Sequence, residues 1–312
     1  MIQHKVRLLL SLTLISAVFW QTWRGLEHAE AEPLRPAVEW RLAKAEALTI
    51  PNGFAAPVWS PDGGALAFIS EQGTFRYSLS DKSLREIARA RAGYKFFWTQ
   101  NGAALAYRAH TPEKPLRIET LDVATGRLKI LAEAADLGLP QETGDGLLQF
   151  RDGADTRLLD AQTGARLEPQ NAARPYVYQL RDDIYLNTRK LTKGDGQYFL
   201  PQLSPDGQKV VYQELTRGLW IADLASGMTT NLGQGNDPAW SPDSKFVVFS
   251  VTADDGHNIT AAELYLADLS GRRRQLTDTP ELLEMNPTWS PDGKFIAFDA
   301  NGTIYKALIE RR

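Results

Sequence analysis

The residue types that most often carry enzyme chemistry are few in this chain and form no recognisable constellation. The sequence contains no cysteine and only four histidines. The lack of cysteine excludes a thiolate nucleophile, a thiolate metal site and a disulfide framework. His257 lies in the polar segment Asp254–Asn258, and His110 precedes Thr111-Pro112. Both positions are typical of exposed loops, so we predict no metal site shared by these histidines.

Carboxylates are more frequent, but their spacing indicates turns rather than catalysis. Asp254-Asp255-Gly256 is similar to the start of a calcium loop, yet it lacks the alternating ligands and the terminal glutamate of such loops. Asp182-Asp183 lies at a predicted turn, and the remaining candidates belong to Ser-Pro-Asp triplets that recur along the chain. The Gly-x-Ser-x-Gly motif of serine hydrolases does not occur. We therefore predict no catalytic residue, no metal and no cofactor.

The Ser-Pro-Asp triplets are part of an internal repeat, which is the strongest signal in the sequence. An aromatic or aliphatic residue, a polar turn and an apolar run recur in five copies, which begin at Trp59, Trp98, Leu203, Trp240 and Trp289. Proline, aspartate and glycine favour a tight turn, and a run such as Phe295–Phe298 is typical of a buried strand. Each copy therefore predicts a β-hairpin.

A second hairpin follows the first, with aspartate and threonine or serine at its turn, as at Asp122 and Thr125. Two hairpins in each repeat make a four-stranded blade, and blades repeated at this period make a β-propeller. Between Trp98 and Leu203 we expect a degenerate blade at residues 137–169, and either a short blade or an inserted hairpin at residues 175–193. The sequence thus predicts an all-β propeller of six or seven blades.

The two ends of the chain are expected to close the ring. The last repeat lacks its fourth strand, and residues 38–49 contain the alternating segment Val38–Leu42. We predict that this N-terminal segment supplies the missing outer strand, which leaves no open sheet edge. The alternative is a short amphipathic helix around Ala43–Ala47. The propeller domain is therefore assigned to residues 38–312, and residues 24–37 are assigned to a linker.

The first 23 residues have the pattern of a signal-anchor. Lys5 and Arg7 precede or begin an apolar run that ends near Trp20 and Trp23, residues suited to a membrane interface. We predict one transmembrane helix formed by residues 5–23, with the propeller in the periplasm of a Gram-negative cell. Cleavage after the distant Ala29-Glu30-Ala31 and secretion to the periplasm is the alternative.

At the repeated Trp-Ser-Pro-Asp-Gly turns the sequence resembles the TolB family and the wider group of WD-like propellers, over roughly residues 38–309. A TolB-like propeller implies protein partners in the periplasm. Related propellers gate the hydrolase of prolyl oligopeptidases and tricorn-type proteases, or carry the active site of oligogalacturonate lyases. The chain departs from each pattern, because we expect neither the α/β domain that precedes the TolB propeller nor a hydrolase domain. It also lacks the several histidines of the lyase metal site.

Residues just before the repeat turns are predicted to line the rim of the central channel and to bind a partner. These residues are Asn52, Lys95, Tyr198, Asn236, Asp237, Glu284 and Asn286. Amides, charges and an aromatic ring together suit protein or peptide recognition. A net charge of −3 without long runs of like charge predicts no nucleic-acid binding. We expect a membrane-anchored interaction or assembly module, for example an accessory subunit of a membrane complex. The alternative is a propeller that binds or converts a small molecule or glycan at the central channel.

Overall fold

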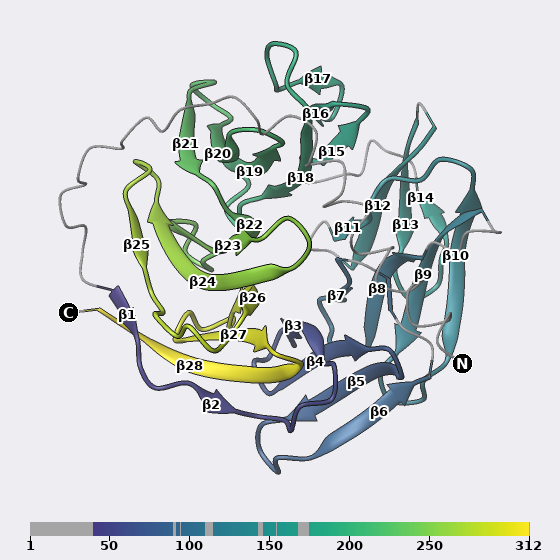
Figure 1. Cartoon of the computed structure of the whole chain (residues 1–312). Helices are drawn as coiled ribbons and strands as arrows, with labels where there is room; N and C mark the ends of the chain where they lie inside the picture. The colour runs from purple at the N-terminus through teal and green to yellow at the C-terminus, as the bar shows by residue number, and fades with distance from the viewer. Residues whose placement is uncertain are drawn as a thin grey trace.

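The computed structural model describes residues 40–89, 92–93, 95–109, 115–142, 146–153, 155–167 and 175–311. All elements in these ranges are β-strands, and the strands form seven sheets. Figure 1 shows the sheets arranged as blades around a central axis. The predicted all-β propeller is therefore confirmed, with seven blades rather than six.

The first four blades follow the chain from the innermost strand outward. Blade 1 contains β3 (Ala55–Trp59), β4 (Ala65–Ser70), β5 (Gly73–Ser78) and β6 (Leu84–Ala88). Blade 2 contains β7 (Phe97–Trp98), β8 (Ala104–Ala109), β9 (Leu116–Asp122) and β10 (Leu128–Ala134). Blade 3 contains β11 (Gln141–Glu142), β12 (Leu147–Asp152), β13 (Asp155–Asp160) and β14 (Arg166–Leu167). Blade 4 contains β15 (Val177–Leu180), β16 (Asp183–Leu186) and β17 (Arg189–Lys190).

The last three blades contain the best-formed repeats. Blade 5 contains β18 (Tyr198–Leu203), β19 (Lys209–Glu214), β20 (Gly218–Asp223) and β21 (Thr229–Gly233). Blade 6 contains β22 (Asn236–Trp240), β23 (Phe246–Asp254), β24 (Ile259–Asp268) and β25 (Arg273–Gln275). Blade 7 contains β26 (Glu284–Trp289), β27 (Phe295–Ala300) and β28 (Thr303–Arg311), and it is completed by β1 (Trp40–Leu42) and β2 (Glu46–Ala47).

The N-terminal segment closes the ring, as predicted from the missing fourth strand of the last repeat. Both β1 and β2 pair antiparallel with β28, with Leu42 opposite Ile309 and Glu46 opposite Lys306. The alternative helix around residues 43–47 is wrong, because the backbone of this segment pairs with β28 instead. Trp40 packs edge-on against Phe246 of blade 6, with 5.3 Å between the ring centroids. The N-terminal segment therefore joins the last blade to its neighbour.

The Ser-Pro-Asp turns are held by the serine and aspartate side chains. Ser60 Oγ donates to Asp62 Oδ1 at 2.6 Å and accepts the N–H of Ala65 at 2.9 Å, while Gly63 takes a left-handed φ of 70°. Ser290 makes the same bonds to Asp292 and Phe295. The hydrogen bond from Ser60 lowers the pKa of Asp62. These aspartates act as turn formers, as predicted.

Three of the four repeated tryptophans hydrogen-bond to the preceding blade, whereas the indole N–H of Trp289 has no described partner. Trp98 Nε1 donates to the Val58 carbonyl at 3.1 Å, and Trp240 Nε1 donates to the Gln202 carbonyl at 3.2 Å. In each case the acceptor lies at the end of the inner strand of the preceding blade. Glu142 takes this position in blade 3, where its Oε1 accepts the Gln100 N–H at 2.7 Å. A partly buried carboxylate therefore replaces the indole in the blade whose repeat is hardest to recognise.

The predicted anchor at residues 1–23 and linker at residues 24–37 lie outside the described residues, as does His110. Among the residues that the structure does describe, no helix has the length and apolar character needed to cross a membrane.

Candidate binding site at the channel mouth

Each inner strand of the well-formed repeats carries a strained residue three positions before its tryptophan or leucine. These residues, here called the bulge residues, have left-handed φ angles and are Ala56 (55°), Lys95 (57°), Leu200 (51°), Asp237 (49°) and Asn286 (51°). The pairing register shifts around this point in blades 1, 5, 6 and 7. A bulge bends the strand and re-aims its side chains, and left-handed backbone at a non-glycine residue costs free energy. Such a repeated local cost is typical of functional sites.

Two bulge residues form an ion pair across the centre of the ring. Lys95 Nζ lies 3.1 Å from Asp237 Oδ1, although the residues belong to blades 2 and 6. These blades lie on opposite sides of the axis (Figure 1), and at least two other blades separate them around the ring. The pair therefore spans the central channel. The two side chains remain 25% and 22% exposed, so they can still contact a ligand.

A second set of side chains surrounds the channel at one register position, here called the ring position, in the second strand of six blades and in the first strand of blade 4. The residues are Ile69, Arg108, Arg151, Gln179, Gln213, Ser250 and Asp299, and each is identified by its partner on the following strand. Gln213 Nε2 donates to Asn236 Oδ1 of the next blade at 3.1 Å. Arg108 likewise reaches the next blade. These contacts place the ring position in the channel wall, close to the bulge residues.

Asp299 is the most perturbed acid of this ring. Its side chain is almost completely buried, and Oδ1 accepts the Ala56 N–H at 2.8 Å and the Asn286 amide at 2.9 Å. Burial raises the pKa of Asp299 to about 7, and the negative charge of Asp237 acts in the same direction. A carboxyl group at the channel mouth can therefore exchange a proton near neutral pH.

The structure brings four of the seven predicted rim residues to the channel. Lys95, Asp237 and Asn286 are bulge residues, and Asn236 precedes one of them, with its amide donating to Thr252 Oγ1 at 3.2 Å. The position of Asn236 lets it contact both the channel wall and the adjoining hairpin.

The other three predicted residues need correction. Tyr198 is buried, with its hydroxyl donating to the Lys193 carbonyl at 2.7 Å, and Glu284 is buried, accepting from Thr279 Oγ1 at 2.7 Å. Both stand five positions before the repeat turn, where side chains pack inside the blade. Asn52 is exposed but bonds Gly302 and Gln72 in the loops outside the channel. Counting back three residues from each repeat tryptophan or leucine gives the bulge residues, whereas counting back five gives packing positions such as Tyr198 and Glu284.

Sequence reasoning missed the charged ring residues Arg108, Arg151 and Asp299. A usable signal was present, because each interrupts an apolar run just after its aromatic residue, as in Tyr107-Arg108 and Phe298-Asp299. Aligning the second strands shows a polar or charged residue after the aromatic one in most copies, as at Asp299, whereas blade 1 has Ile69 there.

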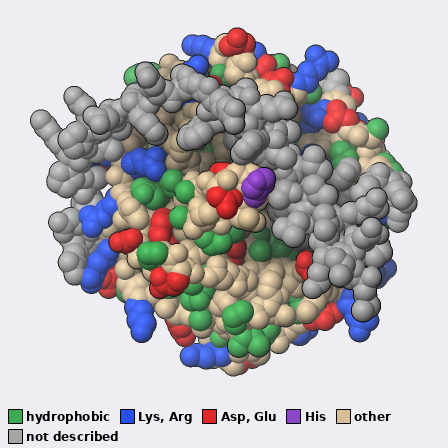
Figure 2. Space-filling view, viewed as in Figure 1, with side chains coloured by type: hydrophobic (Ala, Val, Ile, Leu, Met, Phe, Trp, Pro, Cys, Tyr) green, Lys and Arg blue, Asp and Glu red, His purple; other side chains and the backbone are tan. Residues whose placement is uncertain are grey.

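The hairpin of β23 and β24 extends beyond the ring at this end of the channel. Its strands are nine and ten residues long, and their pairing continues from Ser250 to Asp254, past the start of β22. In Figure 1 the end of this hairpin reaches over the middle of the ring, and Figure 2 shows acidic side chains and a histidine near the middle of the same face. His257 is exposed in the hairpin turn, where Asp255 Oδ1 accepts its backbone N–H at 2.9 Å. The loop prediction for His257 is confirmed.

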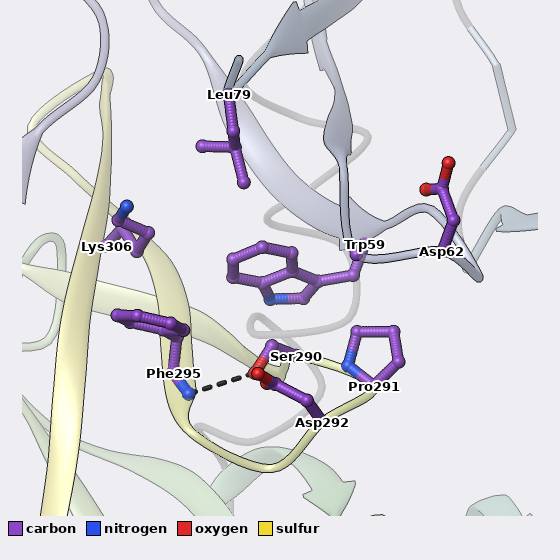
Figure 3. A pocket seen from close by; sticks show the side chains of 9 residues that line it. Trp59, Asp62, Leu79, Ser290, Pro291, Asp292, Phe295 and Lys306 are labelled. Atoms are coloured by element: carbon purple, nitrogen blue, oxygen red, sulfur yellow. Dashed lines mark hydrogen bonds between the residues drawn. The ribbon is translucent and has the colours of Figure 1, made fainter.

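A second hollow lies between the turns of blades 7 and 1 (Figure 3) and has a volume of about 370 Å³. Its walls include Trp59, Leu79, Phe295 and Lys306. The indole N–H of Trp59 already bonds a backbone carbonyl at 3.3 Å, and Lys306 Nζ lies 4.9 Å from the centre of the Phe295 ring. The hollow is thus formed by side chains that hold the blades together. In the described ranges, no group of three or more histidine or acidic residues could hold a metal ion.

Comparison with known proteins supports the fold. Residues 165–307 match the family model described as TolB beta propeller domain. A solved structure described as TolB, from Agrobacterium tumefaciens, is 19% identical with a TM-score of 0.53, and the alignment covers 89% of this chain and 99% of that one. The resemblance to TolB-like propeller repeats is therefore confirmed.

Two further solved structures match with lower TM-scores. An oligogalacturonate lyase in complex with manganese is 16% identical with a TM-score of 0.47, and one from Vibrio parahaemolyticus is 13% identical with a TM-score of 0.48. Each alignment covers 84% of this chain and 79% of the other. No curated protein sequence matches significantly. Because 1323 chains of solved structures are significantly similar, the fold by itself does not identify a function.

Proposed function

We propose that this TolB-like propeller is a protein-interaction module that binds a segment of a partner protein at its channel mouth. The observation that carries the proposal is the ion pair of Lys95 and Asp237, which spans the channel at 3.1 Å between distant blades. Both residues occupy the left-handed position that the inner strands repeat, where the other blades carry alanine, leucine or asparagine, so the backbone position itself does not require a charge. Fixed opposite charges that remain partly exposed are suited to select a polar segment by electrostatic complementarity.

The neighbouring amides add to this recognition surface. Asn236 and Asn286 are held by hydrogen bonds to Gln213 and Asp299, so their polar groups are oriented before a ligand arrives. Preorganised groups lose less conformational entropy on binding than flexible ones. A polypeptide offers backbone N–H and C=O groups that match such amides, which favours a protein segment as the occupant.

The same proposal assigns the propeller to the periplasmic face of the inner membrane. Residues 5–23 would anchor the chain, and residues 24–37 would connect the anchor to β1. In Figure 1 β1 lies at the outer edge of blade 7, away from the channel. An anchor attached at that edge is compatible with a channel mouth that faces a second subunit of a membrane complex.

The test is crosslinking of the full-length protein in its native membrane, followed by mass spectrometry of the captured partners. Lys95→Met with Asp237→Asn removes the charges of the spanning pair while asparagine still tolerates the left-handed backbone. The matched control is Arg117→Met with Glu133→Gln, which removes an exposed ion pair from the outer part of blade 2. We expect a stoichiometric partner to be lost only from the first variant, provided that both variants melt like the wild type. Equal capture by both variants would refute the channel-mouth site.

The anchor is tested separately by deleting residues 1–23. We expect the shortened protein to be recovered in the soluble periplasmic fraction only when a cleavable signal is supplied, whereas the full chain sediments with membranes. Full-length protein that is extracted by salt without detergent would contradict the anchor.

A second candidate function is binding or conversion of a small molecule at the channel. The observation in its favour is Asp299, whose pKa of about 7 suits a general acid or base. Native mass spectrometry of the purified protein tests this candidate. A stoichiometric small molecule that is lost on Asp299→Asn would favour it, and its absence from the wild type would count against it.

A further inference from the structure

Two arginines occupy the ring position of adjacent blades. Arg108 lies in β8 and Arg151 in β12, opposite Ile118 and Thr156 of the third strands. Arg108 Nη1 donates to the Leu137 carbonyl at 2.7 Å, and the next residue, Gly138, donates its N–H to the Arg151 carbonyl at 2.8 Å. The start of blade 3 therefore brings the two residues to the same part of the channel wall.

The positive charge of this pair exceeds the negative charge that the described residues provide. Asp136 binds both Nη atoms of Arg151 at 2.5 Å, and the Gly153 carbonyl accepts a further bond at 2.6 Å. Arg151 Nε is buried and has no described hydrogen-bond partner. For Arg108 the described structure provides a neutral carbonyl and no carboxylate within ion-pair distance. One carboxylate therefore faces two guanidinium groups.

The environment makes the excess charge unfavourable. Burial lowers the pKa of Arg108 and the charge of Arg151 acts in the same direction, while Tyr176 and Asp136 act in the opposite direction. A guanidinium group has five N–H donors in a planar fork, and a single carbonyl leaves most of them available. The ring position does not require a charge, because Ile69 occupies it in blade 1 and is buried there.

We propose that Arg108 and Arg151 form an anion-binding site that takes a carboxylate of the segment bound at the channel mouth. A planar carboxylate accepts two parallel hydrogen bonds from a guanidinium group and supplies the missing negative charge. Asp237 and Asp299 lie in blades 6 and 7, so anions are directed to the arginine side of the channel. This site rests on the proposed function, because it names one chemical group of that partner.

The test needs no knowledge of the partner. The full-length protein in detergent is titrated calorimetrically with acetate, succinate and inorganic phosphate, at constant ionic strength set by sodium chloride. The test variant is Arg108→Gln, which removes the guanidinium charge and its Nη1 bond to Leu137 and does not alter the Arg151–Asp136 pair. The matched control is Arg85→Gln, which removes an arginine on the outer strand of blade 1 that bonds the backbone carbonyls of Val123 and Ala124 in blade 2. Thermal melting checks that both variants remain folded.

We expect saturable binding of acetate and succinate that Arg108→Gln weakens about tenfold or more and that Arg85→Gln leaves unchanged. Binding of phosphate without either carboxylate would overturn the carboxylate assignment. Absence of saturable binding, or equal losses in the two variants, would overturn the site. If Arg108→Gln retains the crosslinked partner that Lys95→Met with Asp237→Asn loses, the anion site fails and the channel-mouth function stands.

Discussion

Replacing Asp299 with asparagine should remove a large part of the pH dependence of stability. An aspartate in the unfolded chain has a pKa near 3.8, whereas burial raises the pKa of Asp299 in the folded protein to about 7. Well below pH 3.8 both states are protonated and the group contributes nothing. Between pH 4 and 7 the unfolded state releases its proton while the folded state retains it, so stability falls as the pH rises.

The size of the effect follows from the shift. Each pKa unit corresponds to about 1.4 kcal/mol, so a shift of about three units costs about 4 kcal/mol above pH 7. Asparagine cannot ionise, and its Oδ1 can still accept the N–H of Ala56. The difference in unfolding free energy between Asp299→Asn and the wild type should therefore grow by about 4 kcal/mol from pH 4 to pH 8.

The assay is urea denaturation at intervals of one pH unit between pH 4 and 8, with the slope on urea compared to confirm the same transition. Asp292→Asn is the control, because the hydrogen bond from Ser290 lowers the pKa of Asp292. Its stabilising contribution is present above pH 4 and is lost only in stronger acid, so this variant should run parallel to the wild type. Parallel curves for Asp299→Asn as well would refute the buried, proton-retaining carboxyl group.

Two further predictions concern the ring. Trp98→Phe should cost about 1 to 2 kcal/mol more in urea denaturation than Trp289→Phe, because only Trp98 donates a described indole hydrogen bond; equal losses would contradict the bond between blades. A protein that starts at residue 50 should be less stable than one that starts at residue 38 by at least about 2 kcal/mol, since it loses Trp40 and exposes the edge of β28. Identical denaturation midpoints, with both proteins monomeric, would show that β1 and β2 do not close the ring.

The hairpins could be predicted from the sequence because their information is local. Proline, aspartate and glycine determine the turn within a few residues, and Ser60 bonds Asp62 and Ala65 without help from another blade. Blade 3 was harder to recognise, because its link to blade 2 is made by Glu142 rather than by tryptophan. When a different residue type makes the contact between two blades, the local sequence no longer shows that the contact exists.

The candidate site was only partly predictable for a similar reason. Lys95 and Asp237 were found because they lie close to a repeat turn, but nothing in either sequence segment indicates that they meet at 3.1 Å. The left-handed bulge was also hidden, since Ala56 and Leu200 are not residues that favour this backbone. A register error of two residues then replaced channel residues by packing residues such as Tyr198.

The ring position gives the strongest physical argument that the channel mouth has a function. The second strand of blade 1 is buried along its whole length, and Ile69 shows that an apolar side chain fits the ring position there. Replacing buried charges by apolar residues of similar size is often neutral or stabilising. The chain nevertheless places Arg108, Arg151 and Asp299 at equivalent positions in three other blades. Residues that do not favour folding are expected where a protein binds a ligand or carries out a reaction. Here these charged residues all lie at one end of the channel.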